Sequence, residues 1–311
     1  MQKSPSSSLW RGSGTLAWAR GTRLAIYRGR NEKIFAIPPR TPVICLARMS
    51  SSFPMRNMRV RFSGDTHIGM KRKHNEDSFI LPEFERVAIV ADGMGGHASG
   101  EVASNMAVEA VAAYLKATQD QAPTTWPFKM DQHVRYETNR LVVGVKHANQ
   151  RIWETSQRNE EQHGMGTTIV GALFLDDRVI IAHVGDSRCY RLRRQQLLQL
   201  TEDHSLLNDY IKMKRLSGEE VGRFQQKNVI VRALGMKESV QVDTQVDTPQ
   251  LHDIYLLCSD GLSGMVPDPL MAEILSDEPD LDSAVDRLLR AANEAGGTDN
   301  ITCVLGRIEP L

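Results

Sequence analysis

Four aspartates adjoin apolar runs that are typical of buried strands, and together their side chains could do chemistry. The runs VAIVAD, IIAHVGD and IYLLCSD end on Asp92, Asp186 and Asp260. Asp299 directly precedes the run ITCVLGRI. One such aspartate is most simply a turn residue, but strands of a common sheet can bring several ends to one edge. Carboxylates that converge repel one another unless cations lie between them, so the pattern predicts a cation site.

The ligands of this predicted site are all oxygen atoms, which restricts the metal. Carboxylate and carbonyl oxygens suit Mg²⁺ or Mn²⁺, whereas structural zinc needs Cys or His at short spacing, and the sequence has no such cluster. Two bridged ions can activate water near neutral pH and hold a phosphoryl group. Asp92 is the candidate bridging ligand, because Gly93 beside it lets a backbone carbonyl also approach an ion.

The loop HIGMKRKHNED adds charged groups of both signs. It ends on Glu76 and Asp77, and Arg72 stands four residues before Glu76. A guanidinium can hold two phosphate oxygens in a fork. Alone, Arg72 is more simply a solvated surface charge. Beside a cluster of carboxylates it becomes a candidate phosphate-binding residue.

Apolar periodicity predicts the elements that position these residues. The predicted strands lie at 60–62, 79–81, 87–91, 167–175, 179–184, 187–192, 197–200, 254–258 and 301–308, with a further extended run at 228–235. The predicted amphipathic helices lie near 102–114, 141–152, 268–276 and 283–295. Antiparallel hairpins connect such strands most economically. We expect one domain of antiparallel sheets with helices packed outside them, and a small mobile flap at the polar segment 204–225.

Composition and charge exclude several classes of protein. The chain has 311 residues, 41% of them hydrophobic, which is typical of a globular protein. Residues 59–311 carry 28 basic and 37 acidic side chains, which argues against nucleic acid as a partner. No apolar run approaches the roughly 18 residues that a membrane span needs. The four cysteines form no C-x-x-C pair and are predicted to be buried thiols in a reducing compartment such as the cytoplasm.

Residues 1–58 are predicted to lie outside the folded domain. They hold ten Lys or Arg and a single acidic residue, Glu32, and their apolar residues show no lasting period. The alternatives are an organellar transit segment, a dispensable leader, and a start assigned too early, since Met49, Met55 and Met58 precede the first convincing strand. We favour a dispensable or misassigned leader over targeting, with the folded domain at 59–309.

Six short motifs follow one another along that domain. They are R-x-x-N-E-D at 72–77, D-G-M-G-G-H-x-x-G-E at 92–101, G-M-G-T-T at 164–168, G-D-S-R at 185–188, S-D-G-L at 259–262 and G-T-D-N at 297–300. Each motif is weak alone. In this order, over about residues 59–309, the chain resembles the metal-dependent type 2C protein serine/threonine phosphatases in their bacterial form.

The resemblance implies an α+β fold, a four-layer α/β/β/α sandwich of two antiparallel sheets flanked by helices. It also implies hydrolysis of phosphoserine and phosphothreonine in proteins by a water molecule that two Mn²⁺ or Mg²⁺ ions activate. Such an enzyme would reverse the signalling of a serine/threonine kinase. We expect it to act as a cytoplasmic monomer on phosphoproteins, without nucleic acid or membrane partners.

By position, the resemblance also assigns roles to the candidate residues. Asp92 would bridge both ions and Gly93 would offer its carbonyl. Asp260 and Asp299 would complete the ligands of one ion. Asp186 would join Asp260 around a third, weaker ion under the flap.

The loop residues would surround this centre. Glu76 and Asp77 would support it, partly through water, and Arg72 would take the phosphate. One position departs from many eukaryotic relatives, which have a histidine directly after the Asp-Gly pair as a proposed general acid. Met94 stands there in this chain, and His97 is a candidate substitute, although capping or packing is the simpler role for it.

Other classes of protein fit the sequence less well. A cysteine-dependent phosphatase needs an arginine six positions after the cysteine, and no cysteine of this chain has one. A P-loop enzyme needs a lysine that the glycine-rich stretch after Asp92 lacks. The remaining alternative is a catalytically silent binding module with the same fold. Loss of activity usually removes an aspartate, and since all of them are present we expect an active enzyme.

Overall fold

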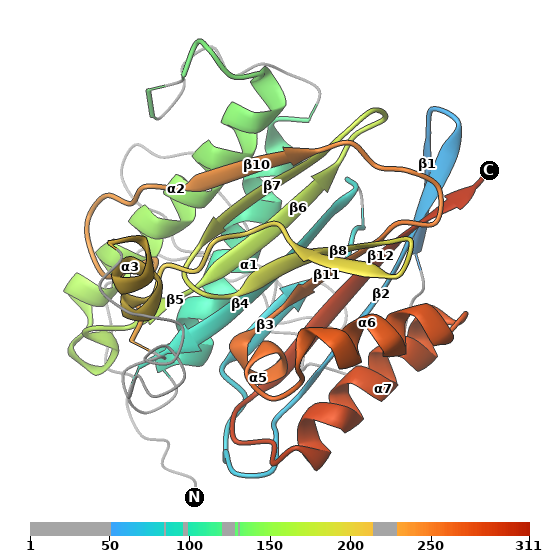
Figure 1. Cartoon of the computed structure of the whole chain (residues 1–311). Coiled ribbons are helices and arrows are strands. Elements are labelled where there is room, and N and C mark those ends of the chain that lie inside the picture. Colours follow the sequence, from blue (N-terminus) through green and yellow to red (C-terminus); the bar gives the residue numbers. More distant parts are fainter. Residues whose placement is uncertain (1–50, 84, 96–98, 120–127, 130, 214–228) are drawn as a thin grey trace, which may run out of the picture. The chain divides into compact units, whose positions relative to one another are not determined.

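A computed structural model gives the arrangement of residues 51–83, 85–95, 99–119, 128–129, 131–213 and 229–311, the residues that the structure describes. Their strands form two antiparallel sheets (Figure 1). The first sheet has the order β1 (Ser51–Met55), β2 (Met58–His67), β12 (Ile301–Pro310), β11 (Ile254–Cys258), β8 (Arg188–Arg193) and β9 (Gln196–Gln199). The second has the order β10 (Asp243–Asp247), β7 (Val179–Val184), β6 (Ile169–Phe174), β4 (Val87–Met94) and β3 (Asp77–Ile80), and the short β5 (Gly166–Thr167) pairs with β4.

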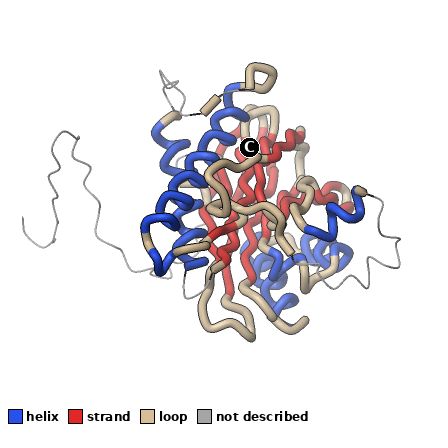
Figure 2. Tube along the Cα trace, turned by 90° about the vertical axis from the view of Figure 1, so that its left-hand side faces the viewer, coloured by secondary structure: helices blue, strands red, loops and turns tan. Residues whose placement is uncertain are grey.

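Helices cover the outer face of each sheet (Figure 2). The long helices α1 (Ser99–Ala117) and α2 (Tyr136–Arg158) pack on the second sheet, and α6 (Asp268–Asp277) and α7 (Leu281–Glu294) pack on the first. Three short helices complete the described elements, namely η1 (Glu160–Gln162), α3 (Leu206–Lys212) and α5 (Asp260–Ser263). Among the described helices, none is both long and apolar enough to cross a lipid bilayer. The predicted four-layer α+β sandwich is confirmed.

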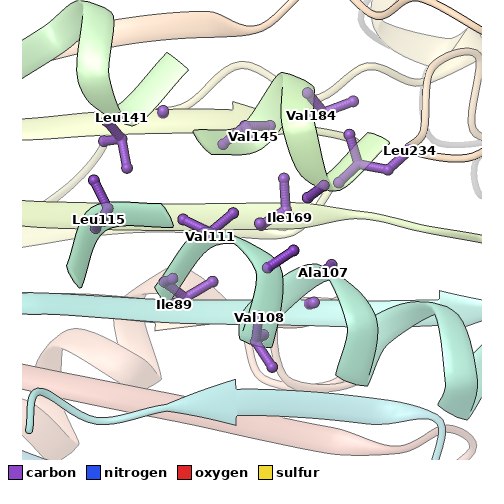
Figure 3. Close-up of a cluster of buried hydrophobic side chains, with 14 of the residues drawn as sticks. Ile89, Ala107, Val108, Val111, Leu115, Leu141, Val145, Ile169, Val184 and Leu234 are labelled. Carbon is purple, nitrogen blue, oxygen red and sulfur yellow. The ribbon is translucent and has the colours of Figure 1, made fainter. Parts of the chain in front are cut away.

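Three apolar cores hold the layers together. Alternate residues of the strands point between the two sheets, where the rings of Phe62, Phe174 and Tyr255 meet edge to face. On the other face of the second sheet, small residues of α1 such as Ala107 let the helix approach β4 closely, and Val111 packs near Ile89 (Figure 3). Burial of each large side chain contributes about 1.5–3 kcal/mol to the free energy of folding. The packed sheets therefore hold the residues at their strand ends in fixed positions.

The structure corrects three expectations from the sequence. Residues 51–55 form β1, which pairs with β2, and Met55 is buried, so the unstructured leader predicted to reach residue 58 is too long. β10 was not predicted, because its sequence DTQVD is polar. The extended run expected at 228–235 is no strand over its described part and forms only isolated bridges at Ile230 and Leu234. Residues 1–50 and residues 214–225 of the predicted flap lie outside the described part of the chain.

Strand pairing brings the candidate site residues that were predicted from the sequence to one edge of the sandwich. β3 begins where β4 ends, and Asp77 is the register partner of Asp92. In the other sheet β11 ends where β12 begins, since Cys258 is opposite Cys303. These are the ends that carry Asp260 and Asp299. The edge therefore collects carboxylates from both sheets.

Candidate active site

Asp77 is a buried carboxylate of this edge that two hydroxyl groups hold in place. Its Oδ2 accepts hydrogen bonds from the Ser259 hydroxyl at 2.8 Å and the Thr302 hydroxyl at 2.6 Å. Its Oδ1 is buried and has no hydrogen-bond partner among the described residues. Burial and the nearby charges of Asp260 and Asp299 raise the pKa of Asp77 to about 7. An orphaned carboxylate oxygen of this kind is suited to a cation or a water molecule bound to one.

The backbone of Asp92 is fixed by two neighbouring threonines. The Asp92 amide donates to Thr168 Oγ1 at 3.0 Å. Its carbonyl accepts from the Thr168 amide and from Thr167 Oγ1, both at 2.8 Å. The Thr168 hydroxyl also pairs with the Ser187 hydroxyl at 2.7 Å. The strand that carries Asp92 is thereby tied to the segment around Asp186.

Gly93 and Gly100 let the start of α1 approach the end of β4. The Gly93 amide donates to the Glu76 carbonyl at 3.1 Å. A Cβ atom on Gly93 would lie 2.1 Å from the Gly100 carbonyl oxygen, and one on Gly100 would lie 2.7 Å from the Glu76 carboxylate. Only glycines fit this approach. The Glu76 carboxylate also accepts a hydrogen bond from the Gly100 backbone, next to the first turn of α1.

Asp260 and Asp299 face this group from the first sheet. Asp260 is the first residue of α5, and its charge is among those that raise the pKa of Asp92. Arg72 Nη2 lies 2.6 Å from Asp299 Oδ2. Arg72 therefore reaches the site, where it is half-exposed and paired with a carboxylate rather than solvated alone.

Asn300 holds the loop that carries Arg72 and Glu76. Its side-chain oxygen accepts from the Glu76 amide at 2.9 Å, and its side-chain nitrogen donates to the carbonyls of Ile68 and His74, each at 2.9 Å. This role of Asn300 was not predicted from the sequence, and neither were those of Thr168, Ser259 and Thr302. Three of these four residues stand inside the quoted motifs, but only the folded chain shows what they contact.

Asp186 lies to one side of the central group. It is buried, and its Oδ1 has no hydrogen-bond partner among the described residues. Burial, together with the charges of Asp260 and Asp203, raises the pKa of Asp186 to about 7. It lines a cavity of about 280 Å³ that Asp260 and Asp299 also line. The structure therefore brings Asp186 near the other aspartates through this shared cavity.

The electrostatics of the cluster favour a divalent cation. Burial, followed by the charges of Asp77 and three further aspartates, raises the pKa of Asp92 well above its ordinary value. The pKa values of Asp260 and Glu76 are raised too, again mainly by burial. Within the described residues, no group of three or more His, Cys, Asp or Glu side chains is placed to hold a metal ion by itself. Mg²⁺ and similar hard ions keep several water molecules and need only one or two carboxylates each, so the residues fit such ions.

Sequence predictions were also made for Met94, His97 and the flap at 204–225. Met94 is partly exposed and pairs with Gly166 of β5 at the end of the same strand. His97, the candidate substitute for a general acid, lies outside the described residues. Of the predicted flap, the described part is residues 204–213, which include α3.

An antiparallel two-sheet sandwich that gathers carboxylates and an arginine at one edge is the arrangement expected of a metal-assisted phosphoester hydrolase. The chain belongs to the protein phosphatase 2C family, whose model matches residues 63–306. This confirms the resemblance found in the sequence.

Individual relatives agree with this assignment. A curated relative, serine/threonine phosphatase stp of Listeria monocytogenes, is 40% identical over 247 residues, which cover 77% of this chain and 92% of the relative. The crystal structure of the Mycobacterium tuberculosis serine/threonine phosphatase PstP superposes with a TM-score of 0.69 at 33% identity, covering 80% of this chain and 99% of the other. A structure of the catalytic domain of PstP in complex with two manganese ions has a TM-score of 0.67 at 32% identity and covers 80% and 98%.

Proposed function

We propose that this protein hydrolyses phosphoserine and phosphothreonine side chains of other proteins. The observation that carries this proposal is the convergence of buried aspartates with raised pKa values at one edge of the sandwich. Membership of a family with curated relatives that are named serine/threonine phosphatases supports the same substrate class. No observation favours the alternative of a silent binding module.

We further propose that the site holds two Mn²⁺ or Mg²⁺ ions. Asp92 would lie between them, with Asp260, Asp299 and the Gly93 carbonyl as further ligands and with Glu76 and Asp77 acting partly through water. A third, weaker ion would lie at Asp186 and Asp260. When bound, such ions lower the pKa of water and neutralise the charge of a phosphoryl group. The structure of a relative in complex with two manganese ions supports the proposal of two ions.

The chain itself supplies position and phosphate recognition. Ser259 and Thr302 hold one oxygen of Asp77 and leave the other available. Thr168 holds the backbone of Asp92. Arg72 would exchange its contact with Asp299 for a forked contact with two phosphate oxygens. The proposed enzyme thus binds its substrate through a residue that the loop already places at the site.

The cellular setting is also a proposal. We propose that the protein acts as a cytoplasmic monomer and opposes a serine/threonine kinase in signalling. The thiols of Cys189, Cys258 and Cys303 are buried without disulfides, which supports a reducing compartment.

The proposed function is tested with a phosphoserine peptide and a phosphothreonine peptide. We expect hydrolysis in the presence of Mn²⁺ that is lost after exhaustive treatment with EDTA, and no trapped phosphoenzyme. Asp92→Asn should lower kcat by orders of magnitude, because the central ligand is changed. Asp277→Asn, an exposed substitution on α6, is the matched control and should have no effect. Full activity in EDTA, or in Asp92→Asn, would contradict the proposal.

A further inference from the structure

His204 lies beside both described ends of the segment 205–230. Its backbone amide donates to the Gly185 carbonyl, and its carbonyl accepts from the Val231 amide, both at 2.9 Å. Ser205 and Ile230 form a β-bridge next to it. The imidazole is buried. His204 therefore contacts both ends of this segment and also Gly185, the residue directly before Asp186.

The hydrogen bonds of the imidazole define its tautomer. The Gly185 amide donates to His204 Nδ1 at 3.0 Å, so Nδ1 carries no hydrogen. Nε2 must then carry it and donate to Asp243 Oδ2 at 3.1 Å. Arg232 Nη1 lies 3.1 Å from Nε2 but donates to Asp243 Oδ1 at 2.9 Å. Asp243 thus accepts from both and keeps Nδ1 free to accept from Gly185.

The peptide that His204 holds is under unusual constraint. Gly185 has a φ of +108°, a conformation that side chains disfavour. A Cβ atom there would lie 2.6 Å from Thr168 Cβ. Glycine is also the most flexible residue in the backbone, so the conformation needs partners to hold it. His204 supplies two, one for the carbonyl and one for the amide of Gly185.

We infer that His204 is a positioning residue for Asp186, which follows Gly185 directly. By fixing the Gly185 peptide, His204 sets the direction of the Asp186 side chain. Because His204 also contacts both ends of the segment 205–230, it links that direction to these ends. The inference rests on the proposed function in one respect, since Asp186 is there a ligand of the third cation. Asp186 itself has an oxygen without a hydrogen-bond partner among the described residues, so its own contacts leave its direction open.

Two substitutions separate the contacts of the imidazole. The side-chain oxygen of asparagine stands two bonds from Cβ, as Nδ1 does, so His204→Asn can still accept from the Gly185 amide. The side-chain nitrogen of glutamine stands three bonds from Cβ, as Nε2 does, so His204→Gln keeps the contact with Asp243 and loses Gly185. Both variants lose the stacking on His183, whose ring lies 4.7 Å away. Their common loss of stability is therefore an internal control.

The first measurement is hydrogen exchange of the Gly185 amide in metal-free protein, and the second is a calorimetric Mn²⁺ titration. We expect faster exchange in His204→Gln than in the parent, and parent-like exchange in His204→Asn. In His204→Gln the weakest Mn²⁺ site should lose about tenfold in affinity, as is typical when the partner of a ligand is removed, while the two tighter sites keep theirs. Equal behaviour of both variants in exchange, or parent-like exchange in His204→Gln, would overturn the inference.

Asp243→Ala tests the same mechanism with the histidine in place. Without the carboxylate, Arg232 can donate to Nε2, which moves the hydrogen to Nδ1 and expels the Gly185 amide. We expect faster Gly185 exchange here too, and an unchanged rate would count against the inference. The exchange readout needs neither metal nor substrate. A parent protein without phosphatase activity would refute the proposed function and leave this test of His204 standing.

Discussion

At the scale of single residues, the site is defined by carboxylates that the fold buries close to one another. Burial is the largest cause of the raised pKa in Asp77, Asp92 and Asp186, and neighbouring aspartates add to it. The neighbouring cation Arg72 contacts Asp299 at the half-exposed rim. Such an arrangement costs folding free energy when the acids are charged, and bound cations would offset that cost.

A first prediction concerns the pH dependence of stability in metal-free protein. Asp77 and Asp186 have folded pKa values of about 7, above the roughly 3.9 of an unfolded aspartate. The folded state therefore binds more protons between these values, and its stability falls as pH rises through that window. His183 and His204, whose pKa values burial lowers, act in the opposite direction, but chiefly below their unfolded value of about 6.5.

The measurement is Tm in EDTA and in saturating Mn²⁺ from about pH 6.5 to about pH 8, where the aspartates dominate. We expect Tm in EDTA to fall across this range and Tm in Mn²⁺ to change less. Asp186→Asn should make the fall in EDTA shallower, because it removes one of the titrating groups. A metal-free protein that becomes more stable toward pH 8 would refute this account.

A second prediction concerns Arg72. Because it would bind phosphate oxygens in the ground state as well as the transition state, Arg72→Ala should act mainly on KM. The loss of charged hydrogen bonds worth about 1.5–3 kcal/mol corresponds to a rise in KM of about tenfold or more. Steady-state kinetics on the phosphoserine peptide measure it, with Arg287→Ala as the control, since Arg287 is also a half-exposed arginine paired with a carboxylate, that of Glu278. An unchanged KM with a lower kcat would assign Arg72 another role.

At the scale of elements, the site depends on how β4 is tied to its neighbours. Thr168 lies between β5 and β6, and its hydroxyl contacts both the Asp92 amide and the Ser187 hydroxyl. The residue therefore joins the element that carries Asp92 to the turn that carries Asp186.

A third prediction follows for Thr168→Val, which keeps the shape and removes the hydroxyl. The buried Asp92 amide would lose its acceptor, which should lower the free energy of unfolding by about 1–3 kcal/mol. We also expect kcat to fall, since the strand end that carries Asp92 becomes less fixed. Urea unfolding and peptide hydrolysis measure the two effects. Thr244→Val, on the exposed face of β10, is the control; equal effects of both substitutions would disprove the specific role of Thr168.

At the scale of the whole molecule, the first sheet extends further toward the N-terminus than the sequence predicted. β1 pairs along its full length with β2, from Ser51 opposite Phe62 to Met55 opposite Met58. Met55 is only 3% exposed and packs in the core between the sheets.

A fourth prediction compares two truncated chains. A chain that starts at residue 51 keeps β1, and the composition of residues 1–50 predicts no packed face, so its Tm should equal that of the full chain. A chain that starts at residue 58 loses β1 and the burial of Met55, at a cost of about 1.5–3 kcal/mol for the side chain alone. Thermal unfolding of both distinguishes them. A lower Tm in the chain that starts at 51 would show that residues 1–50 dock on the body.

The sequence by itself determined the central strands, the flanking helices and the candidate carboxylates. β4, β6, β7, β11 and β12 are buried on both faces, so their continuous apolar runs are a strong local signal. An aspartate that ends such a run lies at or near the end of its strand. The strand ends that carry Asp92 and Asp260 were therefore predictable before any contact was known.

Tertiary structure alone decided the edge strands of the sheets and the contacts between segments far apart in sequence. β10 is a polar strand whose pairing with β7, rather than its own residues, makes it extended. The register that places Asp77 opposite Asp92 depends on the pairing of whole strands. His204 contacts Gly185 across nineteen positions of sequence, and Thr302 reaches Asp77 across 225. Periodicity reports only which face of an element is buried, so the partners of such polar side chains become visible only when the chain has folded.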